Sequence, residues 1–317
     1  MTEEEFLLED RKAKIQSIIR KYGEENFYIS FSGGKDSTVL HHLVDIAVPG
    51  NKMPRVYANT GIEYNEMVKF VKELQENDDR IVIIKPSVPI KKTLEKDGYP
   101  FKSKFHSGLV ERYQKNGYEG QSVKIYIGLQ PTESGVYLSG DHACPKILKY
   151  QFTEGGVNFP ISNKCCNRLK KEIIQKWQKE NNRPYSIIGI MPDEGGQREK
   201  AKCTVFKSDG ILKAFQPLVP LTKAWEDWFI KEYNIKLCKL YYPPYNFART
   251  GCTGSPYNLR LQEELDTLDK FFPNERKQCE IIWKPVYEEY RRIGYRNMRP
   301  LENGRQMTFD EIVTQEE

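Results

Sequence analysis

A short run of residues near the N-terminus has the composition of an anion-binding turn. Phe27 to Phe31 is apolar and partly aromatic, which is typical of a buried parallel strand. Two glycines, Gly33 and Gly34, follow, and apolar residues at helical spacing begin at Val39. Glycine lets the backbone approach a ligand closely, and a helix start presents N–H groups and the positive end of its dipole. The strand, turn and helix therefore predict a site for an anion, of which phosphate is the usual example.

The spacing of the residues in this turn narrows the chemistry. The lysine follows the two glycines at once, so the turn lacks the Gly-x-x-x-x-Gly-Lys-Ser/Thr spacing of kinases and GTPases. Residues 32–37 instead resemble the PP-loop of enzymes that cleave ATP between its α- and β-phosphates. An ordinary glycine turn is the alternative interpretation. From this resemblance we expect the phosphates to contact Ser32, Gly33, Gly34, Lys35, Asp36 and Ser37.

Strands and helices are expected to alternate around this turn. Apolar runs at 54–58, 81–84 and 185–190 have the length of buried strands, and amphipathic segments separate them. The alternation predicts an α/β fold with a doubly wound, mostly parallel sheet and a helical C-terminal region. Ligands of such sheets bind beyond the carboxyl ends of the strands. The glycine turn and the segment 59–61 both lie at such ends, so we expect them to line one pocket.

The chain is expected to have three parts. They are an N-terminal helix at 1–24, a nucleotide-binding α/β domain at 25–235, and a region at 236–317 that combines a cysteine-containing loop with helices. The middle part carries a less regular insertion around 90–165. Within it, residues 121–129 alternate between polar and apolar like a short strand.

The C-terminal half is expected to be mainly helical. Thr222 is a good helix N-cap, and the helix that follows would carry Glu226 and Asp227 in its first turns. Two further helices are expected at 259–271 and 275–293.

Composition excludes some classes of protein. Hydrophobic residues make up 38% of the 317 residues, and no apolar run approaches the roughly 20 residues that span a bilayer. The acidic N-terminus lacks the features of a signal peptide, so we expect a cytoplasmic protein with no membrane partner. The net charge of +5 does not by itself indicate nucleic acid. A solvated face and an electropositive wall for a polyanion both explain the lysines between 85 and 104.

Three cysteines have a spacing that suggests a metal cluster. Cys165 and Cys166 are adjacent, and Cys252 lies far downstream. Four converging thiolates can hold a [4Fe–4S] cluster. The residue three positions after Cys252 is Ser255, so Ser255 or Cys144 would have to supply the fourth ligand. The alternative is that these are buried thiols that pack as small hydrophobic side chains.

Several motifs occur together in the order found in one family. They are the turn at 32–37, Asn59 to Glu63, the Cys165–Cys166 pair, Gly189 leading to Glu194 and Arg198, and Arg249 to Cys252 with Pro256. The chain resembles the phosphoadenosine phosphosulfate (PAPS) reductase family over roughly 25–260, and its first part also resembles the small subunit of ATP sulfurylase. The resemblance implies an adenine-nucleotide α-hydrolase-like fold. It also implies nucleoside contacts from Asn59, Thr60 and Gly61.

Two departures from the family affect the expected reaction. A sulfate-reducing member attacks its substrate with a cysteine in a Glu-Cys-Gly-Leu-His tail, and residues 309–317 contain no such motif. The run Lys35, Asp36 and Ser37 also favours hydrolysis of ATP. We therefore expect ATP-dependent activation, as in relatives that transfer sulfur or place phosphorothioate in DNA, in preference to PAPS reduction.

The expected reaction is adenylyl transfer from ATP. Lys35 and a Mg²⁺ ion placed by Asp36 would neutralise the phosphates while an anionic acceptor attacks the α-phosphorus. Arg198 and Arg249 are expected to clamp the acceptor. Glu194 would place metal or orient Arg198, with a loop salt bridge as the alternative.

Two other functions stay open at this point. Reductive cleavage of PAPS or another sulfonucleotide would need a redox cysteine, for which Cys252 is the candidate. A non-catalytic module that senses nucleotide or binds a partner is the other. The sequence does not identify the acceptor, so nucleic acid and a partner protein both remain candidates beside a small anion.

Overall fold

A computed structural model describes residues 1–192 and 200–301. Contacts between residues divide the chain into two compact units. The first consists of 1–87 and 170–251, and the second of 88–169 with the described residues from 252 onward. Among the described residues, no helix is both long enough and apolar enough to cross a membrane.

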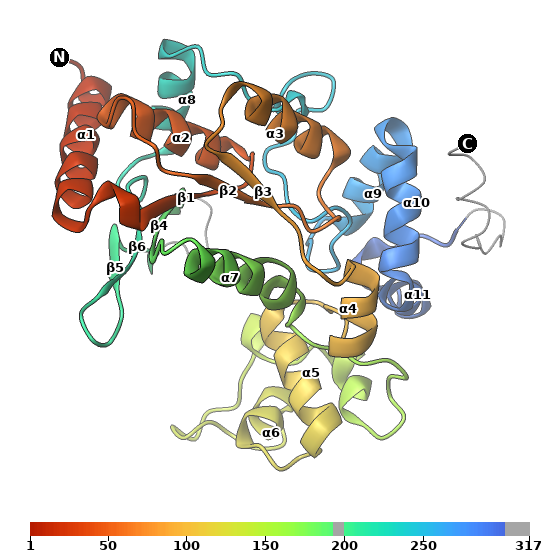
Figure 1. The fold of residues 1–317 in the computed structure, drawn as a ribbon. Helices are drawn as coiled ribbons and strands as arrows, with labels where there is room; N and C mark the ends of the chain where they lie inside the picture. Colours follow the sequence, from red (N-terminus) through yellow and green to blue (C-terminus); the bar gives the residue numbers. More distant parts are fainter. Residues whose placement is uncertain (193–199, 302–317) are drawn as a thin grey trace. The chain divides into compact units, whose positions relative to one another are not determined.

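The first unit is built on a six-stranded sheet (Figure 1). The strand order is β3-β2-β1-β4-β6-β5, and all neighbouring pairs are parallel except the edge pair β5–β6. The predicted α/β fold with a mostly parallel sheet is therefore confirmed. The strands are β1 (Phe27–Phe31), β2 (Arg55–Ala58), β3 (Ile81–Ile84), β4 (Tyr185–Ile188), β5 (Thr204–Phe206) and β6 (Leu212–Phe215).

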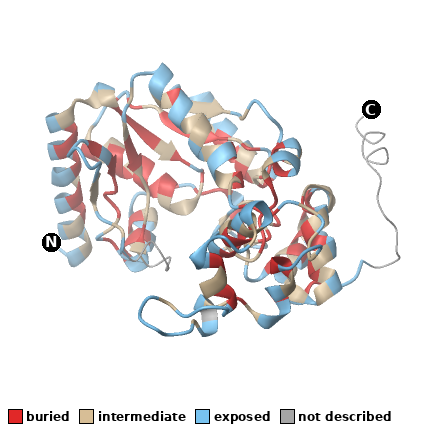
Figure 2. Cartoon of the chain, turned by 90° about the horizontal axis from the view of Figure 1, so that it is seen from below, coloured by how far each residue is buried: buried red, intermediate tan, exposed pale blue. Residues whose placement is uncertain are grey.

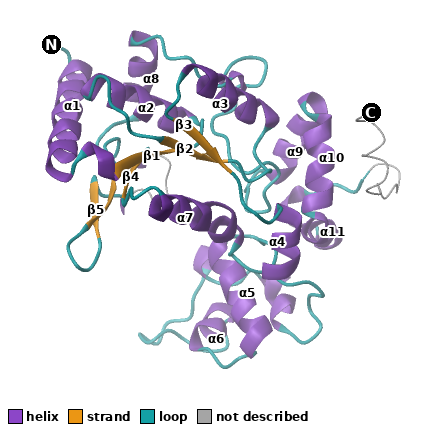
Figure 3. Ribbon diagram, in the orientation of Figure 1, coloured by secondary structure: helices purple, strands orange, loops and turns teal. Residues whose placement is uncertain are grey.

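Helices cover both faces of this sheet (Figure 3). Alternate residues of β1 show the two layers, because successive side chains of a strand point to opposite faces. Phe27 and Ile29 join the larger core with α1, α2 and α8, whereas Tyr28 packs against Trp177 of α7. Figure 2 shows the buried residues concentrated along the strands. The helices are α1 (Glu3–Tyr22), α2 (Lys35–Ala47), α3 (Asn65–Asn77), α7 (Glu172–Glu180) and α8 (Lys223–Glu232).

The strand order places a change of direction beside β1. From β1 the chain proceeds through α2 to β2 on one side, while β4 and β6 lie on the other. Ligands of open α/β sheets bind at such a switch point, outside the carboxyl ends of the strands. The turn after β1 and the residues after β4 meet there.

The second unit is helical within its described residues. Tyr290 shows how its separate segments join: its hydroxyl donates to the Pro256 carbonyl at 3.0 Å and accepts from the Lys102 N–H at 2.8 Å. The helices of eight residues or more are α4 (Ile90–Asp97), α5 (Lys104–Asn116), α9 (Leu261–Phe271), α10 (Pro273–Ile282) and α11 (Lys284–Ile293).

Two sequence predictions about local structure are wrong. The segment expected to be a strand at 121–129 is instead a helix, α6 (Gln121–Ile127). Its buried residues Val123, Tyr126 and Ile127 have the i, i+3, i+4 spacing of a helix face. The apolar residues at 123, 125, 127 and 129 also have the alternation of a strand, so the segment fits both patterns. The single helix expected at 275–293 is two, because Pro285 occupies the first turn of α11 and cannot continue a helix interior.

Candidate functional site

The turn between β1 and α2 is held by two serine hydroxyl groups. The Oγ of Ser37 lies 2.9 Å from the Oγ of Ser32 and accepts a hydrogen bond of 3.2 Å from the Ser32 N–H. The same Oγ donates to the Gly34 carbonyl at 2.9 Å. These bonds hold the backbone of the turn without any ligand.

Gly33 occupies a position that only glycine fits. Its φ is +71°, a left-handed conformation that residues with a Cβ rarely adopt. A Cβ there would lie 2.5 Å from the sulfur of Met67 and 2.9 Å from a methyl carbon of Val71, both on α3. The glycine therefore lets the turn pack directly against α3.

Gly189 allows the end of β4 to touch the first turn of α2. A Cβ at this position would lie 2.9 Å from the carbonyl oxygen of Asp36 and 3.3 Å from the backbone nitrogen of Ser37. Both contacts are with backbone, so a side chain at 189 would push the start of α2 away. The conformation of the turn after β1 thus depends on a residue that directly follows the neighbouring strand.

The N-terminus of α2 is available to an anion. Among the described residues, no side chain caps this helix at its N-cap residue, Gly34. The N–H of Lys35 donates to the hydroxyl of Tyr241 at 3.2 Å, and that hydroxyl lies 3.0 Å from the Oγ1 of Thr250. The loop after α8 therefore closes one side of the helix start.

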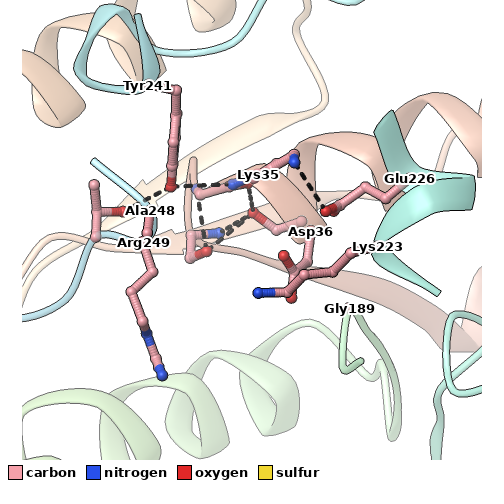
Figure 4. Close-up of a pocket in the computed structure, with 12 residues that line it drawn as sticks. Lys35, Asp36, Gly189, Lys223, Glu226, Tyr241, Ala248 and Arg249 are labelled. Atoms are coloured by element: carbon pink, nitrogen blue, oxygen red, sulfur yellow. Dashed lines mark hydrogen bonds and ion pairs between the residues drawn. The ribbon is translucent and has the colours of Figure 1, made fainter. Parts of the chain in front are cut away.

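A pocket of about 280 Å³ opens at this point (Figure 4). It is smaller than the ~300–1,000 Å³ typical of pockets that enclose whole small molecules. Its walls carry several cationic and anionic side chains beside the helix start. The charged residues that line it are Lys35, Asp36, Lys223, Glu226 and Arg249. All of them belong to the first unit.

Lys35 is held by two carboxylates of α8. Its Nζ lies 2.5 Å from the Oδ1 of Asp227 and 3.3 Å from the Oε2 of Glu226. Burial acts to lower the pKa of Lys35, but the bond to Asp227 and the charge of Glu226 outweigh it and raise the pKa above its ordinary value. The ammonium group is therefore fully charged at neutral pH.

Glu226 is the most unusual group in the pocket. It is only 2% exposed, and its Oε1 has no hydrogen-bond partner among the described residues. Figure 4 shows its carboxylate pointing towards Lys35. Burial, and then the charge of Asp36, raise the pKa of Glu226 to about 7, although Lys35 acts in the opposite direction. Near neutral pH, this carboxyl group is balanced between its charged and neutral forms.

The segment after β2 forms a turn of its own. The N–H of Thr60 donates to Glu63 at 2.9 Å, and the N–H of Gly61 donates to the side chain of Asn59 at 3.1 Å. These residues lie at the carboxyl end of the sheet as predicted, but they are not among those that line the pocket of Figure 4. Their contact with a nucleoside stays a prediction.

The two predicted arginines have different outcomes. Arg249 lines the pocket, together with its neighbours Ala248 and Thr250. Arg198 and Glu194 lie outside the described residues. Their predicted roles therefore stay predictions.

The cysteines of the predicted cluster lie in the second unit. A hydrogen bond with Cys166, then burial, and then the charge of Cys252 raise the pKa of Cys165, so these three thiols interact. Cys144 is different: burial raises the pKa of its thiol to about 11, and the other charges that act on it are Lys102 and Lys149. Within the described residues, no three Cys, His, Asp or Glu side chains are arranged to hold a metal ion. The described residues thus show no preformed metal site, and the cluster stays a prediction.

Sequence reasoning gave no pocket role to five of the lining residues, Lys223, Glu226, Tyr241, Ala248 and Thr250. Glu226 was placed on a helix but not in the site, and Lys223 and Tyr241 were given no role. No local signal identifies them, because each approaches the turn from about 190 residues or more further along the chain. Only Thr250 had a signal, through the motif that contains Arg249.

Comparison with known proteins gives one family match and several distant structural likenesses. The phosphoadenosine phosphosulfate reductase domain model matches residues 26–117. None of the curated proteins compared matches the chain. A PAPS reductase from Candida auris, solved with phosphate, has 12% identity and a TM-score of 0.42, covering 73% of this chain and 82% of that one.

Two other solved structures have similarly low scores. The U34-tRNA thiolase NcsA from Methanococcus maripaludis, solved with its [4Fe–4S] cluster, has 17% identity and a TM-score of 0.37, covering 96% of this chain and 84% of that one. An NH3-dependent NAD synthetase from Campylobacter jejuni has 12% identity and a TM-score of 0.39, covering 95% and 99%. Nothing about the reaction of this chain follows from likenesses at this level.

The family match covers the part of the chain that builds the turn. It begins one residue before β1 and includes the whole of the turn, α2, β2 and α3. The resemblance predicted from the motifs is thus confirmed for residues 26–117, which match the phosphoadenosine phosphosulfate reductase domain model.

Proposed function

We propose that the pocket after β1 binds ATP by its phosphates and that the chain transfers the adenylyl group to an anionic acceptor. The observation that carries this proposal is the convergence of Lys35, Lys223 and Arg249 on the start of α2, whose N-cap residue, Gly34, provides no side-chain hydrogen bond. Helix N-termini and cationic side chains together favour phosphate. The small volume of the pocket suits the phosphate groups more than a whole nucleotide.

Binding would require Lys35 to change partners. In the ligand-free structure its Nζ contacts Asp227 and Glu226, and Asp227 is 67% exposed. An ion pair with an exposed carboxylate contributes about 1 kcal/mol or less, whereas a hydrogen bond to a charged phosphate contributes roughly 1.5–3 kcal/mol. The exchange from Asp227 to phosphate is therefore favourable.

The reaction breaks one phosphoanhydride bond. An acceptor oxyanion attacks the α-phosphorus, the bond between that phosphorus and the oxygen bridging to the β-phosphorus breaks, and pyrophosphate leaves with the bonding electrons. The acceptor then carries AMP. Lys35 and the helix start stabilise the charge that develops on the leaving pyrophosphate. A Mg²⁺ ion bound with the nucleotide, for which Asp36 is the candidate residue, would add positive charge against the phosphates.

The acceptor would be an anion, because Arg249 and Lys223 add positive charge to the walls of the pocket. Arginine binds carboxylate and phosphate groups through two parallel hydrogen bonds. A phosphate of a nucleic acid and the carboxylate of a small molecule or partner protein share this chemistry. The products formed from ATP with each acceptor class distinguish them.

The test is release of pyrophosphate from ATP by the full chain, with products identified by mass spectrometry. The Lys35→Ala variant should bind ATP roughly ten- to a hundredfold more weakly, the loss expected for one charge-assisted hydrogen bond, and should release little pyrophosphate. Lys69→Ala is a matched control, because Lys69 pairs with Glu66 on the surface and does not line the pocket. Equal rates in wild type and Lys35→Ala would contradict the proposal.

The same experiment separates the alternatives. Sulfite release from PAPS with a thiol donor, lost in Cys252→Ser, would indicate sulfonucleotide reduction instead. Tight binding of ATP without turnover, in the presence of metal ions, reductant and each acceptor class, would indicate a nucleotide-sensing module.

A further inference from the structure

The carboxyl groups of Asp36 and Glu226 lie close enough together at the start of α2 to influence each other. Asp36 is in the first turn of α2 and Glu226 in the first turn of α8, and both line the pocket. The charge of Asp36 is the second cause, after burial, of the raised pKa of Glu226, and the two carboxyl groups are also close enough for hydrogen bonding. Two acidic groups are thus brought together by helices that lie far apart in the sequence.

A buried oxygen of this pair lacks the partner that burial normally requires. Glu226 is 98% buried, and its Oε1 has no hydrogen-bond partner among the described residues. Buried carboxylate oxygens are nearly always paired with hydrogen-bond donors or metal ions. Its other oxygen contacts Lys35, the residue that phosphates would attract away. When Lys35 leaves, Glu226 would lose this ion pair while it stays buried.

A divalent cation fits this place. Mg²⁺ and Mn²⁺ prefer oxygen ligands, and Mg²⁺ is usually held by one or two carboxylates together with substrate phosphates. Two carboxylates next to a phosphate-binding turn match this pattern, and three protein ligands are not required. A shared proton between the two carboxyl groups is the competing explanation of the same geometry.

We propose that Asp36 and Glu226 together hold a divalent cation that arrives with the phosphates of the nucleotide, while Lys35 moves from Glu226 to those phosphates. This assignment rests on the proposed nucleotide site and adds a second carboxylate to it, one that is distant in the sequence but close in space. Glu226 exchanges one cation for another, so its charge is balanced in both states. Asp227, which is exposed, holds Lys35 in the ligand-free chain and takes no part in the cation site.

The test measures metal binding apart from activity. Mn²⁺ is titrated into the full chain at pH 7.5, with and without α,β-methylene-ATP, and free Mn²⁺ is followed by its electron paramagnetic resonance signal. With the analogue present, Glu226→Gln should weaken Mn²⁺ binding at least tenfold. Glu232→Gln is the matched control, because Glu232 is an exposed residue of the same helix that does not line the pocket, and it should change Mn²⁺ binding less than twofold.

A second measurement keeps this test independent of the proposed function. Binding of the analogue in EDTA reports the phosphate site alone, and Glu226→Gln should bind it at least as tightly as wild type because Lys35 loses one competitor. Circular dichroism and thermal melting of each variant check the fold, and Asp36→Asn provides a second route to the same loss of Mn²⁺.

The outcomes are distinguishable. Mn²⁺ binding by Glu226→Gln as tight as wild type, or an equal loss in Glu232→Gln, would overturn the cation site. Analogue binding in EDTA with no Mn²⁺ binding to wild type would also overturn it, in favour of a shared proton, and leave the nucleotide site standing. Mn²⁺ binding that needs Glu226, without any binding of the analogue, would overturn the proposed function and the arrival of the cation with phosphates, and would leave Glu226 as a cation ligand only.

Discussion

Replacing Gly189 with alanine tests whether the end of β4 holds the phosphate site in position. The new Cβ would lie 2.9 Å from the carbonyl oxygen of Asp36, where ordinary contacts begin at 3.4 Å. The neighbouring atoms are backbone and cannot rotate away. The end of β4 and the first turn of α2 would therefore have to separate by about half an ångström, the difference between these two distances.

Two effects of known size follow from this separation. Overpacking of this kind typically costs about 1–3 kcal/mol of folding stability. Movement of the α2 N-terminus should also weaken its hydrogen bonds to a bound phosphate. Since a hydrogen bond to a charged group contributes roughly 1.5–3 kcal/mol, loss of one would reduce ATP affinity about ten- to a hundredfold.

Urea unfolding and calorimetric titration with ATP in EDTA measure the two effects separately. Gly251→Ala is the matched control, because a Cβ at Gly251 meets no atom within 4 Å and its φ is not positive. We expect Gly251→Ala to behave as wild type in unfolding. If Gly189→Ala unfolds at the same urea concentration as Gly251→Ala and binds ATP as tightly, then the contact with β4 does not position the site.

Two predictions concern parts of the fold away from the pocket. Arg55 is wholly buried, and its Nη2 lies 2.5 Å from Asp45. Arg55→Met should cost about 3 kcal/mol of folding stability, the lower end of the range for a broken buried ion pair, because Asp45 keeps Arg80 as a partner. A cost below about 1 kcal/mol in urea unfolding would contradict this. Burial lowers the pKa of His106 to about 4. Below its ordinary value of 6.5 the unfolded chain takes up a proton that the folded chain refuses, so stability should fall by up to about 3 kcal/mol between pH 6.5 and 4. Urea unfolding at several pH values should show a smaller decline in His106→Asn than in wild type, and identical declines would show that His106 is not responsible.

Local patterns predicted the elements that carry the strongest signals. The apolar run at 81–84 is a strand, and Thr222 caps α8 by accepting from the Trp225 N–H at 3.2 Å. Where the sequence signal was weak or short, the prediction was wrong or was not made. The segment at 121–129 was ambiguous because it satisfies both periodicities, and β5 and β6, of three and four residues, were not predicted at all. Such short strands exist because β6 pairs with β4 and β5 pairs with β6.

The amino-acid sequence by itself was enough to predict the turn after β1, because the residues that form it are contiguous. A buried strand, a glycine with positive φ, two serines that bond to each other and a helix start are encoded within eleven residues, 27–37. The tertiary structure alone decided what surrounds the turn. Glu226, Asp227 and Tyr241 reach it through the packing of α8 and the loop that follows, and sequence spacing carries no information about which face of a distant helix will meet a pocket. Burial beside Asp36 then gives Glu226 a pKa that no sequence pattern could predict, because desolvation depends on everything packed around the group.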